Sequence, residues 1–589
     1  MTTGTEGPDN LTNDGTQTLE TIDALGGDDV ITVNRPTQPF SDRNIIVNGG
    51  DGFDTLIINA NNYTISENQG FQGSLRIREG SGINWTVHWT SIERLELNNG
   101  RFFNSNISLG DEIDIIRMTP GFGGRIDTNG GNDEIYFTGT GQDGPVVAAG
   151  GAGNDLIDLS GLQYFGSAGS SHEAIGGDGN DVLRGSGYRD RLDGGVGDDT
   201  LFVHYVHPSL PDSSVLFDTA LGGEGNDLIY FGTALSAYDV ADGGAGRDAV
   251  ILQGNVTAVL SQTNLVGIES ISLQTGANAE YGDTANNRYD YNLTTADGNV
   301  GAGQQLIVNG QSLLAGEDFT FNGSAETDGK FLVFGGHGVE NLTGGDGNDI
   351  FFFEGQRWTV GDKVDGGDGR DALVISAGTG FNRIEFAADA LTGIESISLN
   401  NKFATDQTQN PNYSILLDNG NVAPGATLIV NGASLTGTSH MMSIDGSHVL
   451  NGNLKLFGGG SVDSLTGGAG ADTLIGGGSS DLLTGGAGAD TFRYDAVSDG
   501  SKSDYITDFV TGVDRIDLTR IDANSNVGGD QAFTWIGSNA FSHVAGELRI
   551  YLDNGQWRVE GDINGDTIAD FGILFQSGTT PPVESDFLL

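Results

Sequence analysis

Cysteine is absent from the 589-residue chain, which excludes disulfide bonds, thiolate metal sites and cysteine nucleophiles. Basic residues are scarce, because 26 Lys and Arg stand against 80 Asp and Glu and leave a net charge of −54. Nucleic acid is therefore excluded as a partner, since no basic patch is available to meet phosphate. Self-repulsion on this scale opposes folding, and we expect an external cation to offset it.

Long apolar runs are missing as well. No segment approaches the roughly 18 consecutive apolar residues of a membrane-spanning helix, so no membrane span is expected. Residues 1–17 (MTTGTEGPDNLTNDGTQ) lack both a basic flank and an apolar centre, and we do not expect a cleaved secretory signal there. Hydrophobic residues nevertheless make up 37% of the chain, which favours a folded protein over a disordered acidic tail.

Glycine, in contrast, is abundant at 97 residues, and it recurs in a fixed register. Residues 458–492 read GGGSVDSLTGGAGADTLIGGGSSDLLTGGAGADTF, so a glycine pair, an aspartate and a large apolar residue return every nine positions. The repeating unit is GGxGxDxUx, in which U is large and apolar, and this nonapeptide is a known calcium-binding repeat. We expect each unit to form a turn and a short strand, and two units to form one coil of about 18 residues.

The predicted chemistry of these turns is that of calcium. Glycines permit positive φ in a tight turn and direct its carbonyl oxygens toward a common cavity. Stacked coils bring the aspartate of one turn beside those carbonyls, and Ca²⁺ accepts several such oxygen ligands more readily than Mg²⁺ does. A glycine-rich solenoid without metal is the alternative. Because stacked turns share ions, we expect Asp472 to be coupled to its neighbours Asp463 and Asp481.

Strict copies of the unit occur along the whole chain. They begin at Gly49, Gly150, Gly176, Gly194, Gly222, Gly243, Gly344, Gly366, Gly467 and Gly485. The predicted metal-binding residues are Asp54, Asp155, Asp181, Asp199, Asp227, Asp248, Asp349, Asp371, Asp463, Asp472, Asp481 and Asp490, with Gly150, Gly176, Gly194, Gly222, Gly344, Gly467 and Gly485. Degenerate copies occupy residues 24–31, 128–135, 185–192 and 335–342.

A larger duplication links two segments about 123 residues apart. The matching words are DGGAGRDAVIL (242–252) with DGGDGRDALVI (365–375), GIESISL at 267–273 and 393–399, and LIVNG at 306–310 and 428–432. A divergent third copy is expected from residues 49–60 to residues 91–97. Alternating apolar and polar residues between the turns predict half-buried strands, which form either longer solenoid rungs or β-sandwich-like insertions.

These repeats resemble those of the RTX (repeats-in-toxin) calcium-binding proteins of Gram-negative bacteria. The resemblance implies parallel β-rolls, export of the chain in an unfolded state and folding on calcium outside the cell. The fold class expected is therefore all-β, a parallel β-roll or β-solenoid with inserted β segments and a C-terminal β cap.

The C-terminal hundred or so residues carry a second resemblance. The words ITDF (506–509), GVDRIDL (512–518), AGELR (545–549) and GDINGDTIADF (561–571) are similar to the C-terminal domain of serralysin-type secreted metalloproteases. That resemblance implies a cap on the β-roll and an uncleaved type I secretion signal. The last residues, from Asp586 to Leu589, end as that family's tails do.

A possible extra metal site lies in the same segment. Asp562, Asn564, Asp566 and Asp570 follow the spacing DxNxDxxxD, which resembles a calcium-binding EF-hand loop. The glycine falls one place after Asn564, however, and not at the sixth position that such a loop needs. A polar β-turn without metal is the alternative.

Catalytic motifs give little support to an enzyme. None of the eight His residues completes the HExxH motif of zinc proteases, and His172-Glu173 is followed by AIGG. His204 and His207 are compatible with a metal pair, but an ordinary strand is favoured. The sequence contains no GxSxG elbow and no phosphate loop, and the longest stretches between repeats are short for a catalytic domain.

We therefore expect a secreted calcium-binding protein of the cell surface or matrix, non-enzymatic, exported by a type I apparatus. Cell-surface polysaccharide and further copies of the chain are candidate partners. One alternative is a polysaccharide lyase or epimerase in residues 1–150, for which His88 and Arg101 are the loose candidates. Another is an accessory module for a separate catalytic chain.

The chain is expected to divide into seven segments. They are a divergent N-terminal region (1–145), β-rolls at 146–255, 335–378 and 458–492, β insertions at 256–334 and 379–457, and a serralysin-like cap and secretion domain (493–589).

Overall fold

A computed structural model gives the structure of the protein. It describes residues 1–13, 19–34, 43–59, 74–79, 83–98, 103–108, 113–118, 123–137, 144–162, 171–187, 189–203, 217–279, 287–376, 380–400, 412–437, 440–501, 503–577 and 580–589. The chain divides into two units, one of residues 1–274, 278–283 and 298–301, the other of residues 275–277, 284–297 and 302–589. Each unit is described by itself.

The described residues are almost entirely β, as expected. Their helical elements are short 3₁₀ turns, namely η2 (Asp297–Asn299), η3 (Asn419–Asn421), η4 (Val497–Gly500) and η5 (Glu584–Asp586). Among the residues that the structure describes, no helix is both long and apolar enough to cross a membrane.

The first unit begins with two sets of stacked strands. One set is β1 (Thr2–Thr3), β3 (Leu19–Asp23), β5 (Arg43–Asn48) and β8 (Ile83–Thr90), paired in parallel, with β7 (Ser74–Glu79) antiparallel at its edge. The other set is β2 (Asn10–Thr12), β4 (Val30–Asn34), β6 (Thr55–Asn59) and β9 (Arg94–Asn98), also parallel.

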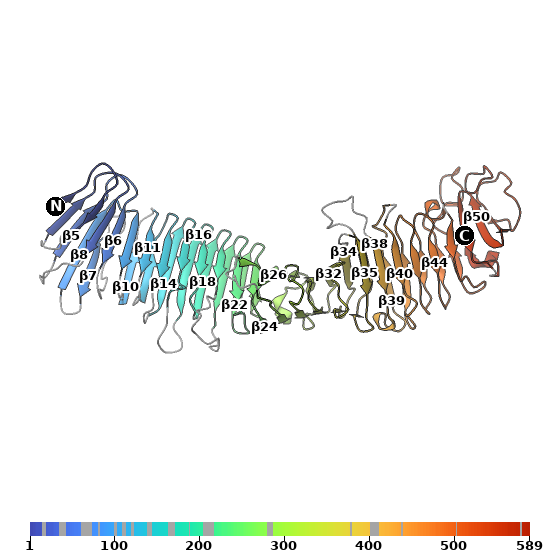
Figure 1. Ribbon diagram of the computed structural model, residues 1–589, viewed down its shortest axis with the longest axis horizontal. Coiled ribbons are helices and arrows are strands. Elements are labelled where there is room, and N and C mark those ends of the chain that lie inside the picture. Colours follow the sequence, from blue (N-terminus) through green and yellow to red (C-terminus); the bar gives the residue numbers. More distant parts are fainter. Residues whose placement is uncertain are drawn as a thin grey trace. The chain divides into compact units, whose positions relative to one another are not determined.

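The same unit continues as a parallel solenoid with two sheets (Figure 1). The first sheet contains β10 (Phe103–Ser108), β12 (Gly123–Asp127), β14 (Val146–Ala152), β16 (His172–Asp178), β18 (Asp190–Val196), β20 (Thr219–Glu224), β22 (Val240–Ala245) and β25 (Leu265–Val266). The second contains β11 (Ile115–Met118), β13 (Glu134–Phe137), β15 (Leu156–Asp158), β17 (Val182–Arg184), β19 (Thr200–Phe202), β21 (Leu228–Gly232), β23 (Ala249–Gln253) and β26 (Ser270–Gln274). Strand β24 (Val256–Val259) lies between β23 and β25 in the chain.

The large apolar residue of each nonapeptide builds the core of this solenoid. Ile157 pairs in register with Leu183, and Leu183 pairs with Leu201 on the next strand, and all three are fully buried. Ile229 and Val250 continue the same row. Burying each of these side chains stabilises the fold by about 1.5–3 kcal/mol. The core is thus a single stack of apolar residues between the two sheets.

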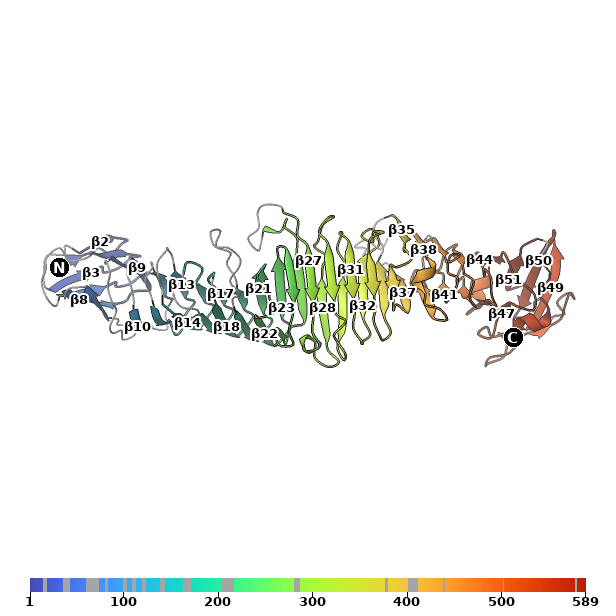
Figure 2. The same ribbon diagram turned by 90° about the horizontal axis from the view of Figure 1, so that it is seen from below.

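The second unit is also built from parallel strands, which are prominent in the turned view (Figure 2). One set is β27 (Tyr291–Thr294), β29 (Phe319–Asn322), β31 (Glu340–Thr343), β33 (Lys363–Asp365) and β36 (Leu391–Thr392). A second set is β28 (Gln305–Asn309), β30 (Lys330–Phe334), β32 (Ile350–Glu354), β34 (Ala372–Ser376), β37 (Ser396–Asn400), β39 (Thr427–Asn431), β41 (Asn453–Phe457), β43 (Thr473–Ile475), β45 (Thr491–Arg493), β47 (Arg515–Asp517) and β52 (Phe587–Leu588).

A third set runs into the C-terminal cap. Its parallel strands are β35 (Phe381–Glu385), β38 (Asn412–Leu416), β40 (Met442–Asp445), β42 (Ser464–Thr466), β44 (Leu482–Thr484), β46 (Asp504–Ile506) and β51 (Phe571–Phe575). Strands β50 (Gln556–Asp562) and β49 (Glu547–Asp553) are antiparallel additions, and β48 (Thr534–Trp535) pairs with β49.

The strands between the glycine-rich turns continue the solenoid as longer rungs. In β28 the burial alternates, so that Leu306 and Val308 are fully buried while their neighbours face outward. Strand β28 pairs in parallel with β30, and β30 pairs in parallel with β32, which follows the GGDGND turn. Of the two arrangements that the sequence left open, the structure therefore has the longer rungs, and the division into seven segments stays a prediction.

Candidate metal centres

Glycine shapes the turns because neighbouring coils approach each other closely. Gly177 and Gly179 have φ of +124° and +134°, which L side chains rarely adopt. A Cβ atom on Gly177 would lie 1.9 Å from the carbonyl oxygen of Gly151, and one on Gly179 would lie 2.0 Å from that of Gly153. The carbonyls of one turn therefore face the backbone of the next turn.

The aspartates of the repeats form a ladder between these turns. The backbone N–H of Asp155 donates to Oδ1 of Asp181 at 2.7 Å, and the N–H of Asp181 donates to Oδ1 of Asp199 at 2.7 Å. The ladder continues from Asp199 to Asp227 and from Asp227 to Asp248, both at 2.8 Å. Each aspartate thus uses one oxygen to fix the coil that precedes it.

The other carboxylate oxygen of most of these aspartates is buried and has no protein partner. This holds for Oδ2 of Asp54, Asp155, Asp181, Asp199, Asp227, Asp248, Asp371, Asp481 and Asp490. None of these residues is more than 2% exposed. A buried carboxylate oxygen without a donor is costly, so this arrangement calls for a cation.

Beside each carboxylate oxygen that lacks a partner, the glycine leaves a small space lined by carboxylate and backbone carbonyl oxygens. A Cβ atom on Gly176 would lie 2.1 Å from Oδ2 of Asp181 and 2.5 Å from the carbonyl oxygen of Gly194. A carboxylate and the carbonyl of the next turn therefore converge on one small space. The other predicted glycines leave the same space beside their own aspartate, and they are Gly150, Gly194, Gly222, Gly344, Gly467 and Gly485. Hard oxygen donors of this kind fit Ca²⁺.

Burial raises the pKa of these carboxyl groups. Desolvation is the main cause, and neighbouring carboxylates add to it, so the pKa values of Asp181 and Asp199 rise from 3.8 to about 7. The pKa of Asp481 rises to about 8, with Asp504 as the main charged neighbour. Without a bound cation burial therefore shifts these groups toward the protonated form, and a divalent ion would replace the proton.

Three of the predicted aspartates differ from the rest. The second carboxylate oxygen of Asp349, Asp463 and Asp472 accepts the N–H of a glycine in its own turn, at 2.8, 2.7 and 2.6 Å. The donors are Gly345, Gly459 and Gly468. Each of these turns is the first turn with a glycine pair in its stack in the second unit, and both oxygens of its carboxylate accept hydrogen bonds within the protein.

The expected coupling of Asp472 to Asp463 and Asp481 is wrong in its geometry. The N–H of Asp472 donates to Asp490 at 2.9 Å, and the N–H of Asp463 donates to Asp481 at 2.8 Å. Because each coil holds two nonapeptides, units that are consecutive in the chain lie on opposite sides of the roll. Stacked neighbours are 18 residues apart here, and not nine.

Glutamates end three of the ladders, which residue spacing alone did not predict. The N–H groups of Asp54, Asp248 and Asp371 donate to Glu93, Glu269 and Glu395 at 2.8, 2.7 and 2.7 Å. The three glutamates occupy the same place in SIERLEL and in the two GIESISL words. Their recurrence was the available signal, and the contact of Glu93 with Asp54 agrees with the divergent third copy expected from residues 49–60 to residues 91–97.

The sequence also left several other ladder aspartates out of the predicted set. Degenerate turns supply Asp29 and Asp133, which accept the N–H groups of Asp9 and Asp114. A separate row of aspartates links Asp190, Asp218 and Asp239. In the cap, Asp504 and Asp514 accept the N–H groups of Asp481 and Asp490 at 2.9 and 3.0 Å. Asp508 accepts the N–H groups of Gly485 and Gly486, so the ITDF word closes the last glycine turn.

The C-terminal DxNxDxxxD loop has a different character. Asp562 accepts backbone N–H groups from Asn564, Gly565 and Thr567, while Asn564 and Asp566 accept N–H groups two residues ahead. Asp570 accepts from the N–H of Ile563 and the side chain of Asn564. These contacts support the polar-turn interpretation, and calcium at this loop stays a prediction.

Of the histidine candidates, His88 and His172 lie in the part of the chain that the structure describes. His88 lies on β8 and is exposed, whereas Arg101 lies outside the described residues, as do His204 and His207. His172 is 2% exposed, and burial lowers its pKa to about 4. Its neighbour Glu173 pairs with Arg191. His172 therefore packs as a neutral residue of the sheet.

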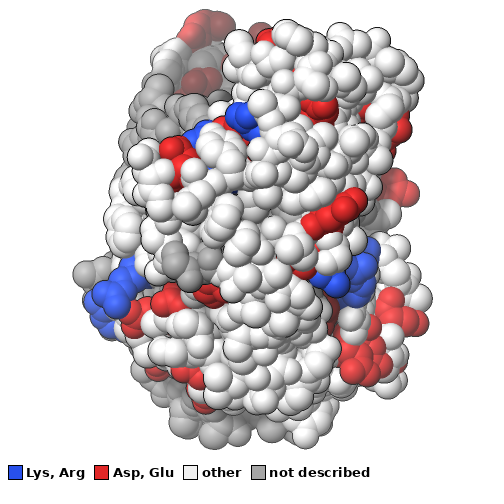
Figure 3. All heavy atoms as spheres, turned by 90° about the vertical axis from the view of Figure 1, so that its right-hand side faces the viewer, with Lys and Arg blue, Asp and Glu red and all other residues white. Residues whose placement is uncertain are grey.

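The acidic charge of the repeats is placed mainly between the coils. Figure 3 views the molecule from the C-terminal side, where most of the visible atoms are uncharged and small groups of acidic and basic side chains lie among them. The twelve predicted aspartates are at most 2% exposed. The large negative charge of the chain is therefore partly internal, where a bound cation acts on it most strongly.

Comparisons with known families agree with this geometry. The model of the RTX calcium-binding nonapeptide repeat matches residues 175–203, 217–233 and 333–355. The model of the Peptidase M10 serralysin C-terminal domain matches residues 438–588. A search of the curated proteins gives no match to the chain. The matches confirm the two resemblances drawn from the repeats and from the C-terminal words.

Proposed function

We propose, from the premise that this chain is a secreted calcium-binding protein with RTX repeats and a serralysin-like C-terminal domain, that it serves as a structural element outside the cell. In this proposal calcium turns an acidic, loose chain into a stiff β-solenoid at the cell surface or in the matrix. The solenoid itself is then the functional product.

The observation that carries this proposal is the carboxylate ladder. One oxygen of each ladder aspartate holds the preceding coil, and the orphaned oxygen lies beside the carbonyls of the following turn. Calcium at that place would join successive coils, so binding energy becomes folding energy. Carboxylates used in this way serve rigidity, and they are not free to act as acids or bases on a substrate.

The difference in calcium concentration across the cell envelope would also make export of the chain one-directional. Inside the cell calcium is too scarce to fill extracellular-type sites, whose Kd values are on the order of 10⁻⁴–10⁻³ M. The metal-free ladder is then destabilised by its own carboxylates, and the chain stays loose enough for a type I apparatus. Outside, calcium stabilises only the folded state and makes return unfavourable.

The proposal is tested by following the chain in a culture of a Gram-negative host that has a type I apparatus. The full chain should leave the cell and bind to cells or to other copies at millimolar calcium, and calcium removal should release it. A variant without residues 493–589 should stay inside. Depolymerisation of polysaccharide by the purified chain would contradict the structural role and favour the lyase or epimerase alternative.

A further inference from the structure

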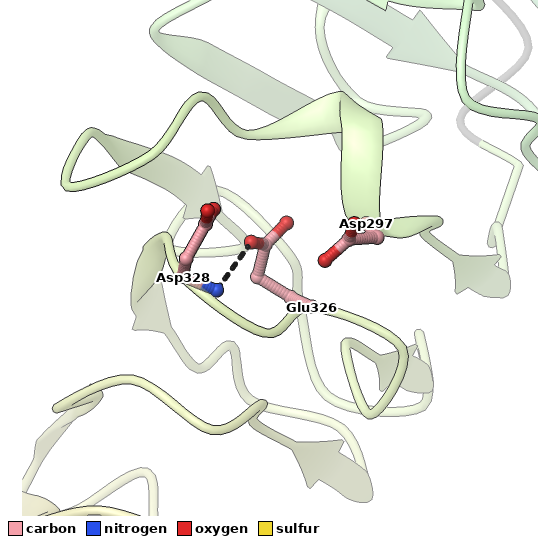
Figure 4. A group of neighbouring side chains, drawn as sticks. All are labelled: Asp297, Glu326 and Asp328. Carbon is pink, nitrogen blue, oxygen red and sulfur yellow. Dashed lines mark hydrogen bonds between the residues drawn. The ribbon is translucent and has the colours of Figure 1, made fainter.

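Outside the strict nonapeptides, three carboxylates meet at one place in the second unit. Asp297 begins η2, and Glu326 and Asp328 lie in the loop between β29 and β30. One carboxylate oxygen from each lies within 4.8 Å of the others, and Figure 4 shows the three side chains facing one another. Among the described residues no lysine or arginine pairs with them.

Glu326 is the member that needs a partner most. It is 0% exposed, and its Oε1 accepts the N–H groups of Gly329 at 2.8 Å and Asp328 at 3.2 Å. Its Oε2 is buried without a hydrogen-bond partner and points into the space between Asp297 and Asp328. An unpartnered carboxylate oxygen in this position is strongly disfavoured unless a cation meets it.

The loop that carries Glu326 lies directly before the turn at 344–349 in its stack, at the position that a further glycine turn would occupy. A Cβ atom on Gly345 would lie 2.5 Å from the carbonyl oxygen of Glu326, and one on Gly367 would lie 2.2 Å from that of Gly345. The N–H of Phe331 donates to Oδ1 of Asp349 at 2.7 Å, as a ladder aspartate would. The loop is therefore the first layer of the stack formed by the turns at 344–349 and 366–371, although it lacks their motif.

The internal duplication supplies the comparison that decides the role of the acids. In the second copy the equivalent residues are Asn419, Val449 and Asn451, and the backbone contacts are the same. The N–H of Thr327 donates to Asp297 at 3.0 Å, and the N–H of Leu450 donates to Asn419 at 2.7 Å.

Two more contacts repeat in both copies. The carbonyl of Glu326 accepts the N–H of Asp346 at 2.9 Å, as the carbonyl of Val449 accepts that of Ala469 at 2.8 Å. The carbonyls of Asp328 and Asn451 accept the N–H groups of Gly303 and Gly425 at 2.7 and 2.9 Å. Val449 is also 0% exposed. The fold thus accepts a neutral apolar residue at this place, so the three acids are not needed to form the loop.

We propose that Asp297, Glu326 and Asp328 bind a divalent cation, Ca²⁺ in the extracellular medium, at a site without the nonapeptide motif. The three carboxylates supply hard oxygen ligands and a charge of −3, which one divalent ion offsets in large part. Asp328 is exposed and Asp297 is half-buried, so the ion has a path from solvent to Glu326. The ion would hold Asp297 against the first layer of the stack, and the second copy would lack this ion.

The main test counts calcium ions on the full chain by native mass spectrometry, with Ca²⁺ alone as the probe. The variant Asp297→Asn/Glu326→Val/Asp328→Asn carries the residues of the second copy, so it should fold and bind one ion fewer than the wild type. The reverse variant, Asn419→Asp/Val449→Glu/Asn451→Asp, should bind one ion more. Unchanged counts in both variants would overturn the proposal.

Two further measurements keep the test independent of folding defects. Glu326→Gln keeps the shape of the side chain and should weaken one calcium-binding step about tenfold, which ordinary surface substitutions would not do. In the unmodified chain, calcium should protect the amides of residues 323–331 from hydrogen exchange more than those of residues 446–454. Equal protection of the two loops, or an unweakened Glu326→Gln variant, would count against the site. Titration with Mg²⁺ alone should leave residues 323–331 unprotected, and equal protection by Mg²⁺ would refute the assignment to calcium.

Discussion

The ladder at residues 150–248 in the first unit and the stacks at 344–371 and 458–490 in the second use the same motif in different ways. In the first, the aspartates of the ladder from Asp155 to Asp248 each keep a buried oxygen without a hydrogen-bond partner. In the second, the leading aspartates Asp349, Asp463 and Asp472 are closed by glycine N–H groups of their own turn. The first ladder therefore depends on metal along its whole length, while the leading turns of the second unit hold their shape without it.

The largest expected effect comes from removing the close approach of two turns in the first ladder. In Gly177→Ala the new methyl group would meet the backbone of Gly151, and a positive φ would add strain. We expect a loss of at least about 3 kcal/mol in the stability of the calcium-loaded first unit. Thermal unfolding in millimolar calcium measures it.

A matched glycine separates strain from collision. Gly425 has φ of +75° and no heavy atom within 4 Å of an added Cβ. Gly425→Ala should therefore cost only about 1–2 kcal/mol. Equal losses in the two variants would show that close packing of the turns is unimportant.

Charge removal within a ladder should distinguish the two regions. Asp199→Asn keeps an oxygen to accept the N–H of Asp181 but removes the charge beside the orphaned position. We expect the calcium midpoint to rise about tenfold, against about threefold for Asp472→Asn, whose carboxylate is already satisfied. Calcium titrations followed by circular dichroism compare them, with exposed Asp530→Asn as the control for net charge. A larger effect at Asp472 would contradict the comparison.

Acidity should act on the ladder in opposite directions with and without metal. The pKa values of Asp181 and Asp199 are raised to about 7 by burial, so the folded state holds more protons than the unfolded state between about pH 4 and pH 7. Stability of the calcium-stripped chain should therefore fall as the pH rises through that window. Calcium affinity should rise over the same window, because protons compete for the ligands.

Denaturant unfolding at several pH values checks the first part, and calcium titration checks the second. A calcium-stripped chain that becomes more stable from pH 5 to pH 8 would be inconsistent with buried carboxyl groups of raised pKa in the first ladder.

The smallest effect is expected at the end of a ladder. Glu269 accepts the N–H of Asp248 and has only one neighbouring aspartate turn. Glu269→Gln keeps the acceptor, so we expect a change below about 1 kcal/mol in stability. Glu395→Gln should behave alike, because it accepts the N–H of Asp371 in the same way. A rise in the calcium midpoint as large as that of Asp199→Asn, measured by the same titration, would mean that the ladder ends bind metal too.

The repeat pattern predicted the fold and the calcium chemistry because nine-residue periodicity directly determines the turn, the strand and the inward apolar residue. It did not predict which aspartates share a ladder, since that depends on the two nonapeptides of each coil facing opposite sides. Asp472 and Asp463 are therefore sequence neighbours but belong to separate ladders. The pattern did not predict Asp504 and Asp514, because their turns contain no glycine pair. Their place in the ladders follows only from the stacking of the coils.

Hydrogen exchange of the full chain before and after calcium removal measures whether the first ladder depends on metal while the leading turns of the second unit do not. Peptides covering residues 150–248 should lose protection when calcium is stripped at neutral or higher pH, because the amides of Asp155 and Asp181 donate to carboxylates whose second oxygen has no partner in the protein. The glycine amides at Gly345, Gly459 and Gly468 should keep more of their protection. Full protection of residues 150–248 in the stripped chain, or equal losses in both regions, would show that the two regions do not differ in their dependence on calcium.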